Sequence, residues 1–492
     1  MVSVENLIEK LFKFLIITFP LLLISGPFLP DLACVLIGLF YLIIKIKDKD
    51  FSDLKKKIII FLIFFFLYIN FNSLFSFDSF ISFSSTLPYL RIILFVLGSA
   101  YLISKYSDIK YLFFYLSLFS YFILVFDSSF QFFTGKNLIG IELKNNSRIS
   151  SFFGDEYIMG SFVSRLLPIL MGLSYLIKTN QNLKIIRFLL VIISLILVIY
   201  SGERLASIYL IFTITLYFYL DFSKKQIIIF FIITGSIFLF FPKQHNTFVN
   251  RIFVHSYNQY KETDNILKFS YRHYLHYYTS YKMYLDNKLL GQGVKSFRFL
   301  CNQDKFSVTE TIVKDNTIYA DKEVKVLFKE LNNVHIEMKL LKNNMVNRNK
   351  NIQSFIIPKK DILKKYVKNN SVVKKDEPII SFYEFKDGCN THPHSFYFQF
   401  LSELGLIGLL FLMTSFIYAF YNLMKIIFKK FKNKINNVES FNAFFYLGIF
   451  INLFPVLPSG NFFNNWLLLM IHLPLAFYIA SNKENLGYFK KL

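Results

Sequence analysis

Long apolar runs separated by short polar segments dominate this chain of 492 residues. A run of about 20 apolar residues forms a helix long enough to cross the hydrocarbon core of a bilayer. The pattern therefore predicts an all-α polytopic membrane protein with about twelve transmembrane helices. The predicted spans are residues 11–30, 31–46, 57–75, 87–104, 109–127, 155–177, 184–201, 204–221, 225–241, 396–424, 441–458 and 463–481.

Lys and Arg are distributed unevenly among the segments that separate these spans. They are concentrated after spans two, six, eight and ten, as in residues 45–57 and 425–434, whereas residues 72–86 and 455–465 contain neither. Because positively charged loops stay in the cytoplasm, we expect both termini there, in a multi-pass membrane protein. The same rule explains the net charge of +23, so no nucleic-acid partner is expected.

This orientation places the longest hydrophilic segment, residues 242–395, on the outward side of the membrane between spans nine and ten. The chain then divides into residues 1–241 with nine spans, this loop, and residues 396–492 with three spans. Residues 266–290 have the amphipathic pattern of a helix that lies on a membrane surface. Residues 301–389 form a Lys- and Asn-rich insert, whose short alternating stretches predict a small β-rich subdomain.

Two cysteines, Cys301 and Cys389, bracket this insert. In an oxidising compartment they would be able to close the insert with a disulfide, and the alternative is two unpaired thiols. The third cysteine, Cys34, falls inside an apolar span and is expected to be a packed thiol.

Charged side chains at the outer edges of the spans are the first candidate functional residues, because charge near the bilayer is costly and often functional. Arg204 lies in a short turn between spans seven and eight, and its planar guanidinium suits a diphosphate. The structural alternative is an ion pair between Glu203 and Arg204. Arg148 is a second candidate phosphate ligand before span six, and Arg165 is an unusual charge within that span.

Two histidines, His392 and His394, mark the boundary between this outer loop and span ten. Histidine changes charge near neutral pH and therefore suits proton transfer. The segment Tyr271-Arg272-His273 is a further candidate on the same side of the membrane. No set of Cys, His and carboxylate residues has zinc-like spacing, and no nucleotide-binding motif occurs, so we expect neither a metal nor another cofactor.

The order of these segments resembles that of the bacterial O-antigen ligase and O-antigen polymerase superfamily. His394-Ser395 followed by Gly405-Leu406-Ile407-Gly408 is similar to the family's His-Asn/Ser…Gly-x-x-Gly signature. Residues 201–206 resemble its Ser-Gly-x-Arg-x-Ala turn, and residues 272–293 resemble its outer arginine helix with a following Gly-x-Gly. The resemblance covers roughly residues 140–480.

The resemblance implies a metal-independent glycosyltransferase of the bacterial inner membrane, with residues 242–395 in the periplasm. It would work at the periplasmic face and take its glycan from undecaprenyl diphosphate. The first expectation is an O-antigen ligase, in which the acceptor is the lipid A–core of lipopolysaccharide; an O-antigen polymerase instead joins lipid-linked repeat units. His394 would be the base, and Arg204 and Arg272 would bind the diphosphate. The supporting residues for substrate binding would be Arg148, Arg165, Glu203 and His392.

Two other classes of function remain open. A transporter of lipid-linked sugars would have polar groups spread through the middle of several spans, whereas the candidates in this chain are at the outer edge. A structural or sensor protein would use the insert to bind a partner.

Overall fold

The computed structural model describes most of the chain, with gaps in the loops and in the insert. The described residues are 4–143, 148–177, 181–221, 228–230, 232, 235, 249–254, 256–257, 270–313, 318–319, 324–330, 335–342, 353–358, 372–374, 378–380, 383–432, 435–455 and 457–482.

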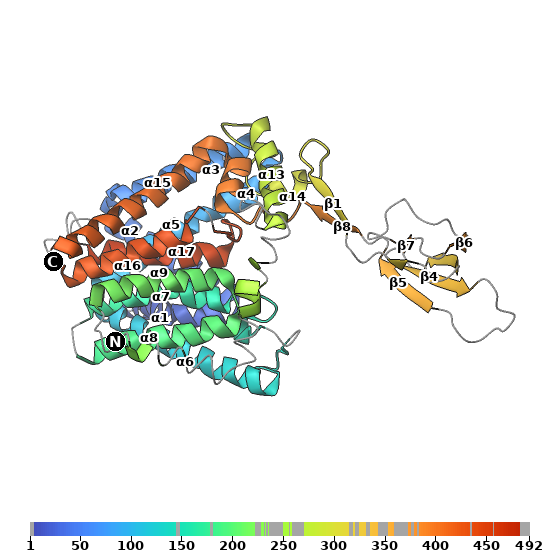
Figure 1. The fold of residues 1–492 in the computed structure, drawn as a ribbon. Coiled ribbons are helices and arrows are strands. Elements are labelled where there is room, and N and C mark those ends of the chain that lie inside the picture. Colours follow the sequence, from blue (N-terminus) through green and yellow to red (C-terminus); the bar gives the residue numbers. More distant parts are fainter. Residues whose placement is uncertain are drawn as a thin grey trace.

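Long helices packed side by side form the body of the protein (Figure 1). Each predicted span except 225–241, most of which lies outside the described residues, coincides with a helix. These helices are α1 (Val4–Ile24), α2 (Phe28–Asp48), α3 (Lys57–Leu74), α5 (Leu90–Lys105), α6 (Asp108–Thr134), α7 (Met159–Leu176), α8 (Gln181–Ser201), α9 (Arg204–Asp221), α15 (Phe396–Lys432), α16 (Asn437–Asn452) and α17 (Asn465–Ser481).

Eight helical segments of the described residues are long and apolar enough to cross a membrane, and one of them combines α5 with the short helix α4 (Ser79–Thr86) before it. The prediction of a multi-pass helical membrane protein is thus confirmed, while the count of twelve spans stays a prediction. Nearly every residue of α7 and α17 is buried, which places these two helices at the centre of the bundle.

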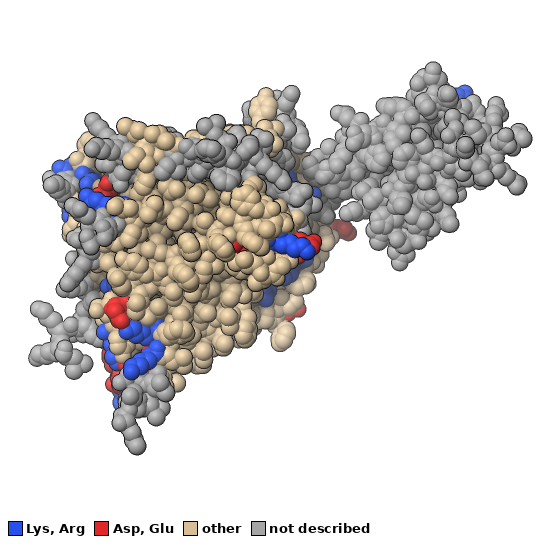
Figure 2. Space-filling view, turned by 90° about the horizontal axis from the view of Figure 1, so that it is seen from below, with Lys and Arg blue, Asp and Glu red and all other residues tan. Residues whose placement is uncertain are grey.

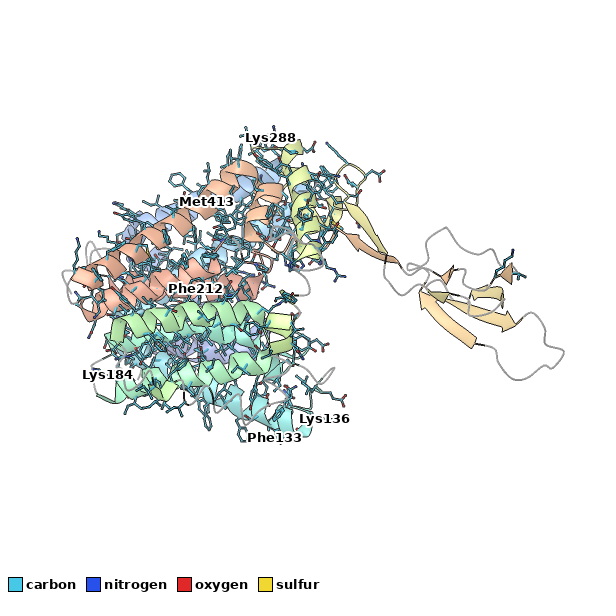
Figure 3. The ribbon with its side chains drawn as sticks, in the orientation of Figure 1. Phe133, Lys136, Lys184, Phe212, Lys288 and Met413 are labelled. Atoms are coloured by element: carbon cyan, nitrogen blue, oxygen red, sulfur yellow. A yellow bond between two sulfur atoms is a disulfide. The ribbon has the colours of Figure 1, made fainter. Side chains whose placement is uncertain are left out.

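Charged groups gather at the two ends of the bundle and leave a broad uncharged belt between them (Figure 2). Large apolar side chains such as Phe64, Phe122 and Tyr421 are mostly exposed along the helices. Water would disfavour such a surface, whereas lipid chains would cover it. Lys184 lies at one end of the bundle, and Lys136 and Lys288 lie at the other (Figure 3).

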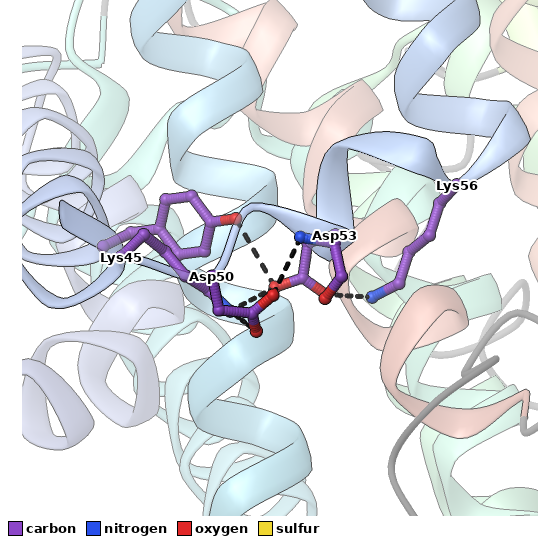
Figure 4. Close-up of polar contacts among 6 residues, drawn as sticks. Lys45, Asp50, Asp53 and Lys56 are labelled. Carbon is purple, nitrogen blue, oxygen red and sulfur yellow. Dashed lines mark hydrogen bonds and ion pairs between the residues drawn. The ribbon is translucent and has the colours of Figure 1, made fainter. Parts of the chain in front are cut away.

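An ionic cluster ties α2 to the start of α3 at the end that contains Lys184 (Figure 4). The Nζ atom of Lys45, whose side chain is only 3% exposed, lies 2.8 Å from Asp53 and 3.2 Å from Asp50. Asp53 also binds Lys56 at 2.7 Å and accepts a hydrogen bond from the hydroxyl of Tyr41 at 3.4 Å. A buried ammonium group needs such partners, so the cluster fixes this turn.

The segment between α9 and α15 extends from the opposite end of the bundle (Figure 1). Its helix α13 (Tyr271–Asp286) runs across the bundle end and is followed by the short helix α14 (Phe297–Leu300). The strands beyond them are β1 (Thr309–Val313), β2 (Ile318–Tyr319), β3 (Val324–Glu330), β4 (His335–Lys342), β5 (Gln353–Pro358), β6 (Val372–Val373), β7 (Pro378–Ile380) and β8 (Tyr383–Asp387).

All of these strands pair in antiparallel fashion, with β1 next to β8, β2 next to β7, and the order β5-β4-β3-β6 in the largest sheet. The β1–β8 ribbon connects the sheets to the bundle (Figure 1). A disulfide between Cys301 and Cys389 closes the base of this ribbon, with the two Cα atoms 5.0 Å apart. The cysteines are thus bonded to each other, and Cys34 is a buried free thiol in α2.

Candidate functional site

Four histidines from two distant parts of the sequence converge where α13 meets the start of α15. The ring of His394 lies 4.2 Å from that of His392, 5.3 Å from that of His273 and 5.4 Å from that of His276, between ring centroids. His273 and His276 are three residues apart on α13, so both point to the same face of the helix. Tyr277 stacks on Phe398 of α15 at 4.4 Å and holds the two elements together.

The backbone of His394 is fixed from the far side by the turn before α17. The carbonyl of His394 accepts a hydrogen bond from the Ser459 N–H at 2.9 Å, and the Ser459 hydroxyl accepts one from the Phe396 N–H at 2.7 Å. His394 has a φ of 57°, a conformation that residues with a side chain rarely adopt. Strain of this kind is retained where the surroundings enforce it, and it is common at functional sites.

Burial makes the neutral form of these imidazoles the favoured one. It lowers the pKa of His394 to about 4, with a smaller contribution from His276. Burial also lowers the pKa of His392 and of His273 to about 4, and neighbouring histidines and arginines add to both shifts. A neutral imidazole has a lone pair available at neutral pH, which a general base requires.

Three arginines lie close enough to the histidine cluster to affect it electrostatically. Arg204, at the first residue of α9, and Arg272, in the first turn of α13, interact electrostatically with His273. Arg298 of α14 interacts electrostatically with His392. Arg204 also donates a hydrogen bond to the hydroxyl of Ser256 at 3.2 Å. The structure therefore brings together His394, His392, Arg204 and Arg272, all of which the sequence indicates.

Glu203 has a different environment from the one expected from the sequence. Its Oε1 accepts a hydrogen bond from the Gly160 N–H at 2.8 Å, and its Oε2 accepts one from the Ser161 hydroxyl at 2.6 Å. These bonds satisfy the free N–H groups at the start of α7, which is the role of a helix cap. Burial raises the pKa of Glu203, and its hydrogen bonds oppose that shift. Glu203 thus positions the turn that contains Arg204.

The side chain of Arg148 is also engaged by the protein. Its Nε donates to the Ser201 carbonyl at 2.9 Å, its Nη2 donates to the Tyr157 carbonyl at 3.1 Å, and its guanidinium stacks on the Tyr157 ring. These contacts join the segment before α7 to the end of α8. Arg148 therefore supports the turn that contains Arg204.

Arg165 lies inside the bundle, and its contacts are with other helices rather than with the histidines. It is buried in α7, donates a hydrogen bond to Asn452 of α16 at 2.6 Å and lies over the Tyr209 ring of α9. A buried arginine between three helices orients them, and its direct role in substrate binding stays a prediction.

The Gly-x-Gly segment and the broken helix α15 form the frame of the site. α15 is interrupted at Gly405, which has a φ of 63°, and the loop at residues 291–293 crosses this break. The Gly293 N–H donates to the Glu403 carbonyl at 2.8 Å, and the Gln292 N–H donates to the Ser402 carbonyl at 2.9 Å. A Cβ atom on Gly291 would lie only 2.6 Å from the Glu403 backbone, so only glycine permits this approach.

Two cavities lie beside this frame. The first has a volume of about 260 Å³ and a polar wall, formed by residues near the start of α5 together with Lys295 and Asn465. The second has a volume of about 320 Å³ and lies among apolar side chains of α3, α15, α16 and α17, including Phe65, Phe411 and Ile471. Tyr89 lines both cavities, and its hydroxyl is 2.8 Å from Nε2 of His472.

The sequence analysis assigns no role to three residues of the site: His276, Arg298 and Asn390, whose side-chain amide lies 3.0 Å from Nε2 of His394. The spacing of His273 and His276 is the one signal that indicates a shared helix face, whereas Arg298 and Asn390 stand outside any motif. Among the described residues, no group of three or more His, Cys, Asp or Glu side chains is arranged to hold a metal ion. Comparison of the chain with known protein families and with curated proteins finds no match.

Proposed function

We propose that this protein is a glycosyltransferase that moves a glycan from undecaprenyl diphosphate to a sugar hydroxyl at the periplasmic face of a bacterial inner membrane. The observation that supports the proposal best is the position of His394. This buried imidazole, neutral at physiological pH, lies at one end of a membrane bundle beside His273, with which the arginines of α9 and α13 interact. A base beside two fixed cations suits the transfer of a group from a diphosphate.

The reaction proceeds as a single displacement at the anomeric carbon. The acceptor hydroxyl gives its proton to His394 while its oxygen forms a bond with the sugar carbon. The bond between that carbon and the diphosphate oxygen breaks, and undecaprenyl diphosphate leaves with the bonding electrons. Arg204 and Arg272 stabilise the negative charge that develops on the leaving group, and the sugar carbon inverts its configuration.

The first candidate for the acceptor is the lipid A–core, which makes the protein an O-antigen ligase. The alternative is an O-antigen polymerase, whose acceptor is a second lipid-linked repeat unit. The ladder of surface polysaccharide from a deletion strain separates the two. Polymer that remains on the lipid carrier indicates a missing ligase, whereas core capped by single units indicates a missing polymerase.

The direct test is transfer by purified His394→Ala protein in lipid nanodiscs. Loss of a general base lowers the rate of such steps by about 10²- to 10⁴-fold, so we expect glycan transfer to fall by that factor. Arg204→Ala is expected to lose about 10²- to 10³-fold, the usual effect of removing one group that stabilises charge in the transition state. Lys288→Gln is the control, because Lys288 is exposed at the same end of the bundle. Normal transfer by His394→Ala protein would overturn the proposal.

A further inference from the structure

The apolar cavity of about 320 Å³ is a groove that follows the long axes of the helices. On α3 its wall consists of Lys57 and of four residues on one face of the helix: Ile58, Phe61, Leu62 and Phe65. This stretch covers about 12 Å along the helix axis, at 1.5 Å per residue. The groove is therefore narrow and runs across the bilayer, in the direction that lipid chains take.

The groove begins at the end of the bundle that is far from the histidine cluster. Lys57 is the first residue of α3 and follows the ionic cluster directly, whereas Phe400, in the second turn of α15, lines the groove toward the other end. The wall on α15 includes Tyr418, whose side chain is 50% exposed. The groove therefore opens on the uncharged belt that lipid chains cover.

Polar groups in the wall are bound to other protein groups. The hydroxyl of Tyr89 lies 2.8 Å from Nε2 of His472, and that of Tyr478 lies 2.8 Å from a tyrosine hydroxyl of α16. The Ser415 hydroxyl donates to a carbonyl one turn earlier in α15 at 3.0 Å. These groups need no hydrogen bond from an occupant, so a hydrocarbon chain fits the groove better than a polar molecule does.

Lys57 gives one end of the groove a positive charge. Its side chain is exposed, and within the described part of the chain it forms no hydrogen bond or ion pair. The nearby Asp53 is already occupied, because it binds both Lys45 and Lys56 (Figure 4). The ammonium group of Lys57 is thus available to an anionic group at the mouth of the groove, and such a group is present in the head of an acidic phospholipid.

We propose that the groove between α3, α15, α16 and α17 binds a phospholipid with an anionic head group. The head lies at Lys57, and one hydrocarbon chain lies along α3. The chain fills the space between α15 and the rest of the bundle, so the bound lipid stabilises the packing of α15. This lipid is not a substrate of the transfer reaction, because its head is at the opposite end of the bundle from His394.

The test is native mass spectrometry of purified, delipidated full-length protein, titrated with phosphatidylglycerol and phosphatidylcholine that have the same chains. We expect wild type to retain one phosphatidylglycerol in preference to phosphatidylcholine. Lys57→Gln should weaken the affinity for phosphatidylglycerol about fivefold, the usual effect of one lysine at a membrane surface. Lys184→Gln is the matched control, because Lys184 is exposed at the same end of the bundle.

A second pair of variants tests the groove itself. Ser415→Trp places an indole in the groove and should abolish retention of the lipid. Ile417→Trp adds the same bulk to the lipid-facing side of α15, where Ile417 is 55% exposed, and should bind as wild type does.

Three results would overturn the inference. They are equal retention of the two lipids by wild type, equal affinity of Lys57→Gln and Lys184→Gln protein, and equal retention by Ser415→Trp and Ile417→Trp protein. The first comparison uses wild type alone, so it decides the matter even if a variant fails to fold. Retention of undecaprenyl phosphate in preference to phosphatidylglycerol would assign the groove to the donor tail and would also overturn the inference.

Discussion

The side-chain amide of Asn390 donates a hydrogen bond to Nε2 of His394 at 3.0 Å. The orientation of the amide is determined because its oxygen accepts a hydrogen bond from the Thr391 N–H at 2.7 Å. Nε2 of His394 is therefore the nitrogen with the lone pair, and in the neutral ring the proton is on Nδ1. In the proposed reaction the Asn390 amide therefore orients the ring through the Nε2 lone pair, and the acceptor hydroxyl must displace the amide before Nε2 can remove its proton.

Asn390→Ala should reduce the rate of transfer while leaving the affinity for substrates nearly unchanged. Losing one hydrogen bond that orients the base is expected to lower kcat about fivefold to tenfold. Asn390→Asp is the informative companion, because a carboxylate beside the ring favours the imidazolium form and raises the pKa of His394. As the pH is lowered, the activity of the Asp variant should therefore begin to decline at a higher pH than that of wild type. An unchanged pH profile in the Asp variant would show that Asn390 does not act on His394.

The pH dependence of the wild-type reaction follows from the burial of His394. The base is active when neutral, and burial together with His276 lowers its pKa from an ordinary value of 6.5 to about 4. We expect kcat/KM to stay constant from neutral pH down to about pH 5 and to fall only as the pH approaches 4. Replacing His276 with Phe removes a side chain that lowers the pKa of His394 and should move this fall to higher pH. An inflection near 6.5 in wild type would contradict the prediction.

The helices were predictable because membrane spans depend on composition and length, which a sequence shows directly. His394, Arg204 and Arg272 could also be selected as candidates from the sequence, since charged or titratable residues near a membrane edge are uncommon. Their roles in the reaction stay predictions. The helix-capping role of Glu203 could not be predicted. Its partners Gly160 and Ser161 are in another helix, so nothing in the local sequence distinguishes a capping residue from a substrate ligand.

The rest of the site depends on contacts between distant segments. His276 meets His394 only because α13 folds across the start of α15, with the whole insert between them in the sequence. Nothing in the local sequence distinguishes Lys295 from other lysines. Its positive φ is held by hydrogen bonds from neighbouring backbone N–H groups to Ser82 and Glu403, which come from two other helices. Periodicity and motif spacing contain no information about such pairings.

Gly405→Ala should destabilise the protein strongly, because this position combines a positive φ with a crowded site. Gly405 has a φ of 63°, and a Cβ atom would collide with the Leu289 carbonyl. Gly140 is a matched control, since it has a φ of 88° but no heavy atom within 4 Å of the added Cβ. Gly140→Ala is expected to cost about 1 kcal/mol in the free energy of unfolding, and Gly405→Ala several times more. Thermal unfolding in detergent measures both, and equal losses would contradict the crowding argument.

The disulfide between Cys301 and Cys389 is expected to order the segment that precedes His392. Replacing both cysteines with serine removes this link and should destabilise the loop by about 2–5 kcal/mol. Transfer should fall as well, because residues 390–394 extend directly from Cys389.

A membrane-impermeant maleimide, applied to intact spheroplasts, should label the two cysteines only after reduction. Labelling without reduction would place two free thiols there, and no labelling after reduction would indicate that the insert is not periplasmic.

Asp53→Asn should destabilise the protein far more than Asp50→Asn, although both remove a carboxylate from Lys45. The Asp53 side chain is 7% exposed and binds both Lys45 and Lys56, whereas the Asp50 side chain is 47% exposed. Removing the buried partner leaves the Lys45 ammonium poorly compensated in a site of low polarity, which typically costs about 3–5 kcal/mol. The exposed partner contributes about 1 kcal/mol or less because water screens it.

Thermal unfolding of the two variants measures the difference. The double variant Lys45→Met with Asp53→Asn should recover much of the loss, because it leaves no buried charge at position 45. Equal effects of the two single substitutions would show that Lys45 reaches water in spite of its 3% exposure.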